Sequence, residues 1–337
     1  MKQWRFWLGI AISLVCLTLV LWNVDYREIL DALKRADHVW LIAASVPYVS
    51  TIASKVFRWR LLFPDEYQPL SRRNLFSALM ISYALNTILP ARLGELARAY
   101  VVGETERVSK SLALSTIVVE KVLDVLTLLL FLILLLPLVP IPSWVQRAAL
   151  IMTPLFLGLF ALILALTYQR GSTLRLASSV LKRIPHLDAD QMTKSLDSAL
   201  AGFDVLRSPR RNAVLWGWSF VVWATGALFI LFVMYAFHID APPSAAVLLL
   251  CVTSLGMTVP SSPGYIGVYH WLVVSTLLIF NVNRELALSF AFALHALTFL
   301  PLTLAGIFFM IRENYSLQTI QQEALGSSAE KPSTVDR

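Results

Sequence analysis

The sequence predicts an all-α integral membrane protein. We expect a polytopic helix bundle of about six full spans and two re-entrant broken-helix hairpins in inverted repeat, with both termini cytoplasmic. Of the 337 residues, 57% are hydrophobic and only 15% are charged, a balance typical of membrane proteins. Long apolar segments, together with two apolar stretches that proline and glycine interrupt, point to the same class.

Six apolar segments are long enough to cross a hydrocarbon core of about 30 Å. They cover residues 6–22, 39–57, 110–137, 145–167, 212–238 and 284–312. The first follows the basic start MKQWR, as the apolar region of a signal peptide does. The next residues, NVDYREIL, offer no small-residue cleavage pattern, so we expect a retained span.

Two further apolar stretches are interrupted. Residues 74–90 run into PARLGE, and residues 244–260 run into PSSPGYIG before the apolar character resumes. Proline and glycine free backbone groups that lipid cannot satisfy, so such breaks require protein or a water-filled cavity around them. Each stretch therefore predicts a hairpin that enters the membrane and returns.

Loop charges set the expected orientation, because cytoplasmic loops carry an excess of lysine and arginine. Residues 55–73 are rich in basic side chains, and residues 168–211 carry eight basic and four acidic ones. Residues 23–38 carry three basic and four acidic side chains, whereas 138–144 and 239–243 have no basic residue. We therefore expect the first two segments in the cytoplasm and the other three outside.

The cytoplasmic segment 168–211 contains apolar residues at helical spacing. They are Met192, Leu196, Leu200 and Phe203. This pattern predicts an amphipathic helix that either lies on the inner membrane surface or packs against the bundle.

The chain reads as a single membrane domain, 1–312, followed by a cytoplasmic tail, 313–337, that is partly disordered. Inverted repeats are expected at about 39–137 and 212–312. The repeat is visible in KSLALS at Lys110 and RELALS at Arg284, an offset of 174 residues. Chance similarity between leucine-rich helices is the alternative, but the loop charges make the two hairpins enter from opposite sides. Broken helices at matching places in inverted halves indicate a transport site near the midplane.

Three charged residues fall near the middle of the third span: Glu120, Lys121 and Asp124. The two carboxylates lie roughly 12 and 18 Å from the apolar start of that segment. Ionisable groups at that depth cost on the order of 3 kcal/mol each, so they normally face a bundle interior or a polar cavity. Lys121 is positioned to neutralise part of the charge. In the second repeat, His295 and Thr298 take the places of Lys121 and Asp124.

The first hairpin carries a second charged group. PARLGELAR places Arg92, Glu95 and Arg98 around Gly94 at three-residue spacing, so a helix would bring them near one face. Arginine's planar fork suits phosphate, and a helix start adds backbone donors. A phosphate-bearing ligand is one interpretation, and a cytoplasmic turn that follows the positive-inside rule is the other.

The second hairpin, PSSPGYIGVYH, is first of all a break in a helix. Ser261 can rebond backbone groups that Pro263, Gly264 and Gly267 leave free. His270 is either a titratable site residue or an interfacial residue beside two aromatic neighbours.

The sequence gives little support for nucleic-acid binding, for soluble-enzyme chemistry or for a cofactor or metal site. The basic residues lie in short loops, which argues against a nucleic-acid partner. The sequence has no P-loop, dinucleotide fingerprint or nucleophile elbow, and we expect no cofactor and no metal. Cys16 and Cys251 lie in apolar segments, where cysteine acts as a small hydrophobe.

Together these motifs resemble the flippase-like membrane region of lysylphosphatidylglycerol synthases, also catalogued as an uncharacterised membrane protein family. The matching residues are Pro90, Arg92, Gly94, Glu95 and Arg98, then Glu120, Lys121 and Asp124, then Pro263, Gly264 and Gly267. The match covers roughly residues 5–312. Two positions depart from the family pattern: His270 stands where glutamate is usual, and Tyr265 where glycine is common.

The resemblance implies translocation of a polar-headed lipid between the leaflets of a bacterial or archaeal cytoplasmic membrane. Full-length synthases add a cytosolic transferase domain, and only 25 residues follow position 312 here, so we expect no enzyme activity. The expected partners are a lipid substrate and a separately encoded lipid-modifying enzyme. The alternatives are a membrane-embedded partner of a glycosyl- or aminoacyl-transferase and a secondary transporter of a small anion.

Overall fold

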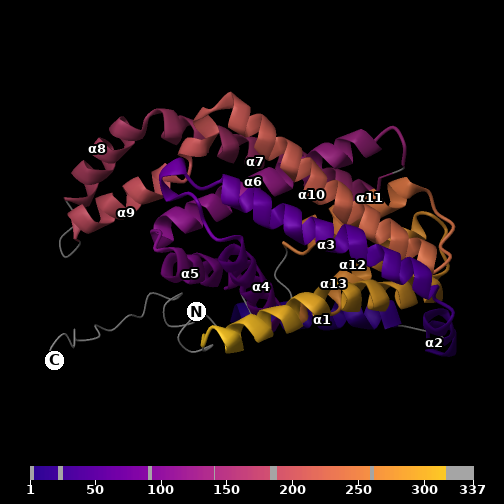
Figure 1. The fold of residues 1–337 in the computed structure, drawn as a ribbon. Coiled ribbons are helices and arrows are strands. Elements are labelled where there is room, and N and C mark those ends of the chain that lie inside the picture. Colours follow the sequence, from indigo (N-terminus) through magenta and orange to yellow (C-terminus); the bar gives the residue numbers. More distant parts are fainter. Residues whose placement is uncertain are drawn as a thin grey trace.

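The fold is known from a computed structural model that describes residues 4–21, 26–89, 93–139, 141–182, 188–258 and 262–315. Within these ranges every regular element is helical, which confirms the all-α class (Figure 1). The helices are α1 (Trp4–Leu21), α2 (Tyr26–Lys34), α3 (His38–Leu61), α4 (Arg72–Ile88), α5 (Gly94–Glu106), α6 (Lys110–Leu135), α7 (Ser143–Tyr168), α8 (Arg170–Leu181), α9 (Ala189–Ala201), α10 (Pro209–Ala236), α11 (Pro243–Gly256), α12 (Val268–Leu278) and α13 (Arg284–Arg312), with short 3₁₀ turns η1 (Asp65–Tyr67), η3 (Asp204–Arg207) and η4 (Pro263–Tyr265).

Four of the described helices are long and apolar enough to cross a membrane: α3, α7, α10 and α13. Helix α6 has 26 residues, but it carries three charged side chains near its middle. Helix α1 has 18 residues and coincides closely with the first expected span. The exact number of spans and their orientation in the membrane stay predictions.

Helix α3 is longer than the sequence indicated. The expected span ended at residue 57, with a cytoplasmic loop over 55–73, but the helix continues to Leu61. Lys55 and Arg58 therefore belong to α3, and the Arg58 side chain is fully buried. The helix can carry this arginine because two carboxylates of α6 neutralise it.

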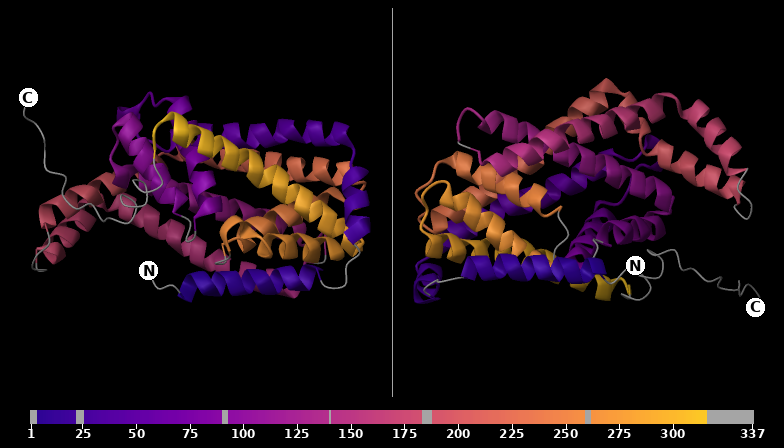
Figure 2. Two further views of the ribbon diagram at one scale, coloured as in Figure 1. Left: turned by 90° about the horizontal axis from the view of Figure 1, so that it is seen from below. Right: turned by 180° about the vertical axis from the view of Figure 1, so that it is seen from behind.

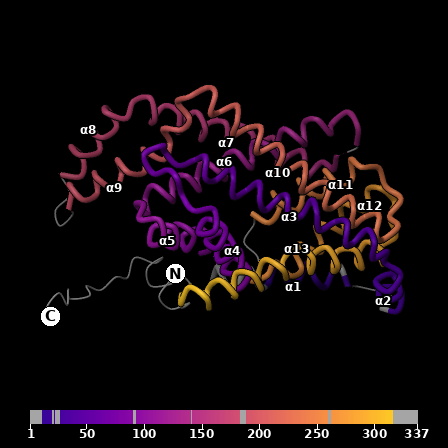
Figure 3. Tube along the Cα trace, in the orientation of Figure 1, coloured from indigo at the N-terminus to yellow at the C-terminus, as the bar shows by residue number. Residues whose placement is uncertain are grey.

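The two expected repeats share one order of elements: a long helix, two short helices and a second long helix. Helices α3 to α6 form the first set and α10 to α13 the second. Aromatic contacts between Trp40 and Tyr235, and between Phe57 and Trp218, show that α3 and α10 pack along each other in opposite directions. The first short helix of each set packs against the last long helix of the other, α4 on α13 and α11 on α6 (Figures 1 and 3).

The end of α4 lies close to the turn η4 that precedes α12. Gly264 in the second turn lies next to the backbone carbonyl of Thr87, near the end of α4. Helix α1 covers the second pair, and the Ser13 hydroxyl accepts a 2.9 Å hydrogen bond from the Ser262 amide. Figure 2 shows α1 along the edge of the bundle beside α12.

Two glycines allow helices to approach each other through their backbones. A Cβ at Gly94 would lie 2.1 Å from the Ser82 carbonyl oxygen, so α4 and α5 touch through the backbone. Gly267 has φ +90°, and a Cβ there would lie 2.1 Å from the Ser13 carbonyl oxygen. A side chain at Gly94 would push α5 away from α4, and one at Gly267 would push the start of α12 away from α1.

The segment 168–211 forms a helical pair, α8 and α9, that projects from one end of the bundle (Figure 1). Arg170 ties the pair together through Asp197 and Asp204, each at 2.6 Å. The predicted apolar repeat lies on and just after α9, whose C-terminal end packs on α6: a Cβ at Gly202 would meet the Ser115 hydroxyl.

The connections that are rich in basic residues and the connections that are not lie at opposite ends of the bundle. The segment between α2 and α3 lies at the end of α10, where the Asp37 amide donates a 2.8 Å hydrogen bond to the Ala236 carbonyl. At the other end, beside α8 and α9, Arg211 pairs with Asp65. Which end of the bundle faces the cytoplasm stays a prediction.

Candidate functional site

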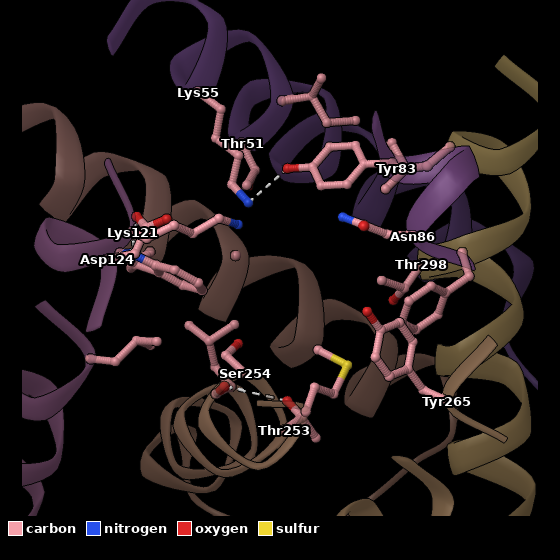
Figure 4. A pocket seen from close by; sticks show the side chains of 18 of the residues that line it. Thr51, Lys55, Tyr83, Asn86, Lys121, Asp124, Thr253, Ser254, Tyr265 and Thr298 are labelled. Carbon is pink, nitrogen blue, oxygen red and sulfur yellow. Dashed lines mark hydrogen bonds between the residues drawn. The ribbon is translucent and has the colours of Figure 1, made fainter. Parts of the chain in front are cut away.

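A cavity of about 310 Å³ lies between the two sets of helices. Its wall contains residues of α3 to α6 from the first set and of α10 to α13 from the second. Charged residues come from the first set, namely Lys55, Glu95, Arg98, Glu120, Lys121 and Asp124. The second set contributes hydroxyl and aromatic groups, including Trp223, Thr253, Ser254, Tyr265, Tyr269 and Thr298 (Figure 4).

Arg58 holds both carboxylates of α6. Its guanidinium lies 2.6 Å from Asp124 Oδ1 and 3.3 Å from Glu120 Oε1, and it also donates to the Ser219 hydroxyl at 3.0 Å. Trp223 donates a 3.0 Å hydrogen bond to Asp124 from the facing helix α10. The predicted buried acidic pair is therefore neutralised from α3.

Arg98 completes this network from the first hairpin. Its Nη2 atom lies 2.9 Å from Glu120 Oε2, and its side chain is only 2% exposed. The guanidinium carbon lies 3.5 Å from the centre of the Trp59 ring, a cation–π contact. The expected phosphate-binding role of Arg98 must therefore coexist with, or disrupt, an ion pair to Glu120.

Lys121 and Glu95 form a second ion pair, at 3.2 Å. Both residues line the cavity, and the Lys121 side chain is 51% exposed. Lys121 is thus paired with the first hairpin instead of with the carboxylates on its own helix. Gly94 begins α5 beside this pair, and its amide donates to the Asn86 side-chain oxygen at 2.9 Å.

Lys55 is a site residue that the sequence analysis assigned to a loop. Its amine donates a 3.0 Å hydrogen bond to the Tyr83 hydroxyl and lies 5.4 Å from the centre of the Trp223 ring. Figure 4 shows the amine of Lys55 directed toward Tyr83 at the cavity. One signal was available, because Thr51, Lys55 and Arg58 follow at spacings of four and three, which places them on one helix face.

The second hairpin brings His270 and His295 together. Their ring centres are 4.9 Å apart, and His270 is only 2% exposed. His295 binds the Gly264 carbonyl through Nε2 at 2.8 Å, so it fixes the turn at Pro263–Tyr265. Thr298, one helical turn on, lines the cavity, as its expected counterpart Asp124 does.

Two predicted site residues, Arg92 and Ser261, lie outside the described residues, as do Pro90 and the end of the tail. Of the others, Glu95, Arg98, Glu120, Lys121 and Asp124 meet at one cavity. Pro263, Gly264, Gly267 and the two histidines shape the turn beside it.

Comparison with known proteins places this arrangement in a family. Residues 6–306 match the family described as the lysylphosphatidylglycerol synthase TM region. The chain belongs to this family. Together with the long apolar helices, the match identifies a multi-pass membrane protein.

Three relatives of this member of the lysylphosphatidylglycerol synthase TM region family are archaeal. A UPF0104 membrane protein of Methanothermobacter thermautotrophicus is 24% identical over 79% of this chain and 82% of its own length. Another, from Methanocaldococcus jannaschii, is 23% identical over 68% of each chain. Glycosyltransferase AglD of Haloferax volcanii is 29% identical over 120 residues, 36% of this chain and 19% of AglD. No solved structure matches the chain.

Proposed function

We propose that the protein moves a polar-headed lipid between the two leaflets of a cell membrane, without catalysing a reaction on it. The observation that carries the proposal is the cavity between the two sets of helices, where charged and hydroxyl groups face a common space inside an apolar bundle. Polar groups in that position are costly unless they serve a ligand or a structural pair.

In the proposed mechanism, Arg58, Arg98, Glu120 and Asp124 form a charged framework that stays inside the protein. The headgroup contacts the groups that face the space, and the acyl chains remain in lipid. Because the two sets of helices run in opposite directions, rocking one against the other would open the cavity first to one leaflet and then to the other.

A transfer assay in vesicles tests the proposal. Purified protein is incorporated into vesicles that carry lipids with a fluorescent acyl chain, and a membrane-impermeant reductant bleaches the outer leaflet. We expect transfer of at least one headgroup class among anionic phosphatidylglycerol, zwitterionic phosphatidylcholine and cationic lysylphosphatidylglycerol. Protein-free vesicles set the background rate.

Helix α10 offers a matched pair of variants. Gly226 lines the cavity, whereas a Cβ at Gly217, on the same helix, would meet nothing within 4 Å. Gly226→Trp fills the cavity and should abolish transfer, while Gly217→Trp should leave it unchanged. Equal transfer by both well-folded variants, or a wild-type rate equal to background for every lipid, contradicts the proposal.

A second candidate is a membrane partner of a glycosyltransferase. The stretch of similarity to part of AglD favours it, because that relative is named as a glycosyltransferase. This candidate predicts no transfer by the isolated protein. It predicts instead that the protein copurifies with a lipid-modifying enzyme from its own organism.

A further inference from the structure

The charges around the cavity do not balance. Among the described residues, the cavity wall and the framework behind it contain four basic side chains and three carboxylates. These are Lys55, Arg58, Arg98 and Lys121 on the basic side and Glu95, Glu120 and Asp124 on the acidic side. The local network thus has one positive charge in excess.

The ion pairs show which cation is left over. Glu120 contacts both arginines, Asp124 contacts Arg58, and Glu95 contacts Lys121. Lys55 has no carboxylate within ion-pair distance among the described residues, and its partners are the Tyr83 hydroxyl and two aromatic faces. Those partners compensate an ammonium group less than a carboxylate does.

Two of the three carboxylates, Glu120 and Asp124, are correspondingly unsuited to a cationic ligand. The Glu120 side chain is 3% exposed and held between Arg58 and Arg98, while Asp124 also accepts from Trp223. A cationic headgroup that reached either carboxylate would have to displace a buried arginine and leave that charge unpaired. Breaking such a buried pair is strongly unfavourable, because it leaves an uncompensated charge in the protein interior.

We infer that Lys55 binds an anionic group of the ligand, so that this cavity selects a net-negative, hydroxyl-bearing headgroup: a phosphate ester of a polyol or sugar. Further hydrogen-bonding groups line the same cavity as the amine. The Asn86 side-chain nitrogen and the Ser254 hydroxyl line the cavity and make no hydrogen bond to the described residues. Tyr83 accepts from Lys55 and keeps its own proton to donate. Aromatic side chains such as Trp223 and Tyr265 give flat faces for a polyol.

This inference rests on the proposed lipid-binding function and narrows its substrate class. The binding test uses purified wild-type protein in detergent, titrated with short-chain phosphatidylglycerol, phosphatidylcholine and lysylphosphatidylglycerol while thermal stability is followed. We expect phosphatidylglycerol to bind roughly tenfold or more tightly than the cationic lipid, a difference of about 1.4 kcal/mol. Stronger binding of the cationic lipid overturns the inference.

Variants of Lys55 test whether this residue causes the preference for the anionic lipid. Lys55→Met keeps the length of the side chain and removes the charge, so it should weaken phosphatidylglycerol binding by about tenfold. Lys55→Arg should retain the preference for the anionic lipid. Lys55→Gln provides a second neutral variant in case the methionine protein is poorly folded. If a folded neutral variant binds phosphatidylglycerol as well as wild type does, Lys55 is not the anion-binding residue.

Lys110 supplies the matched control. It also lies over a tyrosine ring, 4.4 Å from the centre of Tyr100, but it is at the start of α6, does not line the cavity and pairs with Glu104. Lys110→Met should leave every affinity unchanged. An equal loss in Lys110→Met and Lys55→Met would mean that general surface charge governs binding, which overturns the inference.

Two further experiments distinguish a failure of this inference from a failure of the proposed function. Glycerol phosphate without acyl chains should bind at Lys55 far more weakly than the lipid if the natural ligand is a lipid. Equal affinity keeps the anion site but assigns it to a small solute. If wild type binds phosphatidylglycerol through Lys55 yet transfers no lipid in vesicles, the inference stands and the transfer proposal fails. If Lys55→Met transfers anionic and cationic lipids at wild-type rates, transfer stands and the inference fails.

Discussion

The hydroxyl oxygens of Thr51 and Thr225 lie 2.8 Å apart, and the two residues are 174 positions apart in the sequence. The same offset relates KSLALS at Lys110 to RELALS at Arg284. Thr51 and Thr225 therefore occupy equivalent positions in the two expected repeats, and their hydroxyl groups meet where α3 packs on α10. If a pseudo-twofold axis relates the two expected repeats, it passes through this contact.

A cross-link at this point tests how the halves move. In a background of Cys16→Ala and Cys251→Ala, the pair Thr51→Cys and Thr225→Cys should form a disulfide on mild oxidation, because the two hydroxyl oxygens that the sulfur atoms replace already lie 2.8 Å apart. Rocking about the axis leaves this point nearly still. We expect the oxidised protein to retain lipid transfer, measured in vesicles before and after reduction.

The opposite result identifies another motion. If oxidation stops transfer and reduction restores it, α3 must slide along α10, and the rocking mechanism is wrong. Mass spectrometry of the linked peptides confirms that the bridge has formed in each sample.

The all-α class was accessible from the sequence because it follows from composition and from the position of breaks. The inverted repeat stays a prediction. Composition required a membrane bundle, and PARLGE and PSSPGYIG marked where helices stop. The acidic residues Glu120 and Asp124 were visible as charges inside an apolar segment. Their partner Arg58 was not, because an arginine near the end of a span equally satisfies the positive-inside rule.

The sequence did not specify which charged side chains form ion pairs across the bundle. Lys121 is adjacent to Glu120 in the chain, yet its ion-pair partner is Glu95 on α5. Which charges meet depends on how α3, α5 and α6 approach one another, and that depends on side-chain packing over long sequence distances. The same packing decides that Lys55 faces the cavity instead of water.

Removing Arg58 should strongly destabilise the fold. Arg58→Met leaves Asp124 and Glu120 buried with one cation fewer, at a cost of about 3–5 kcal/mol in the free energy of unfolding. Titration with a denaturing detergent measures this free energy. Arg175→Met on α8, where the arginine is exposed, is the control and should have little effect.

Neutralising Asp124 should restore part of the stability that Arg58→Met loses. In the double variant Arg58→Met with Asp124→Asn, the most closely paired carboxylate no longer carries an uncompensated charge. We expect a smaller destabilisation than the sum of the two single changes. Strict additivity would mean that Arg58 and Asp124 do not stabilise each other.

Gly94 should tolerate no side chain. A Cβ at this position would lie 2.1 Å from the Ser82 carbonyl oxygen, so Gly94→Ala forces α5 away from α4 and costs about 1–3 kcal/mol of stability. A matched control is Gly158→Ala on α7, where a Cβ meets nothing within 4 Å. There alanine should raise stability by up to about 1 kcal/mol. Equal melting temperatures for the two variants would contradict the close packing of the first hairpin.

The orientation in the membrane can be measured with single cysteines. Asp190 on α9 and Asp240 in the α10–α11 connection are both exposed and lie at opposite ends of the bundle (Figure 1). In a protein without Cys16 and Cys251, we expect Asp240→Cys to react with an impermeant maleimide added to intact cells. Asp190→Cys should react only after the membrane is opened, since the segment around it is rich in basic residues.

This experiment also decides whether the halves are inverted with respect to the membrane. Helices α3 and α10 run in opposite directions, so residues at their opposite ends must label from opposite sides if both helices span. Labelling of both cysteines from outside would require that one long helix does not cross, and the cavity between the two sets would lose access to one leaflet. The reverse pattern, with Asp190→Cys outside, would keep the inverted repeat but reverse the orientation that the loop charges predict.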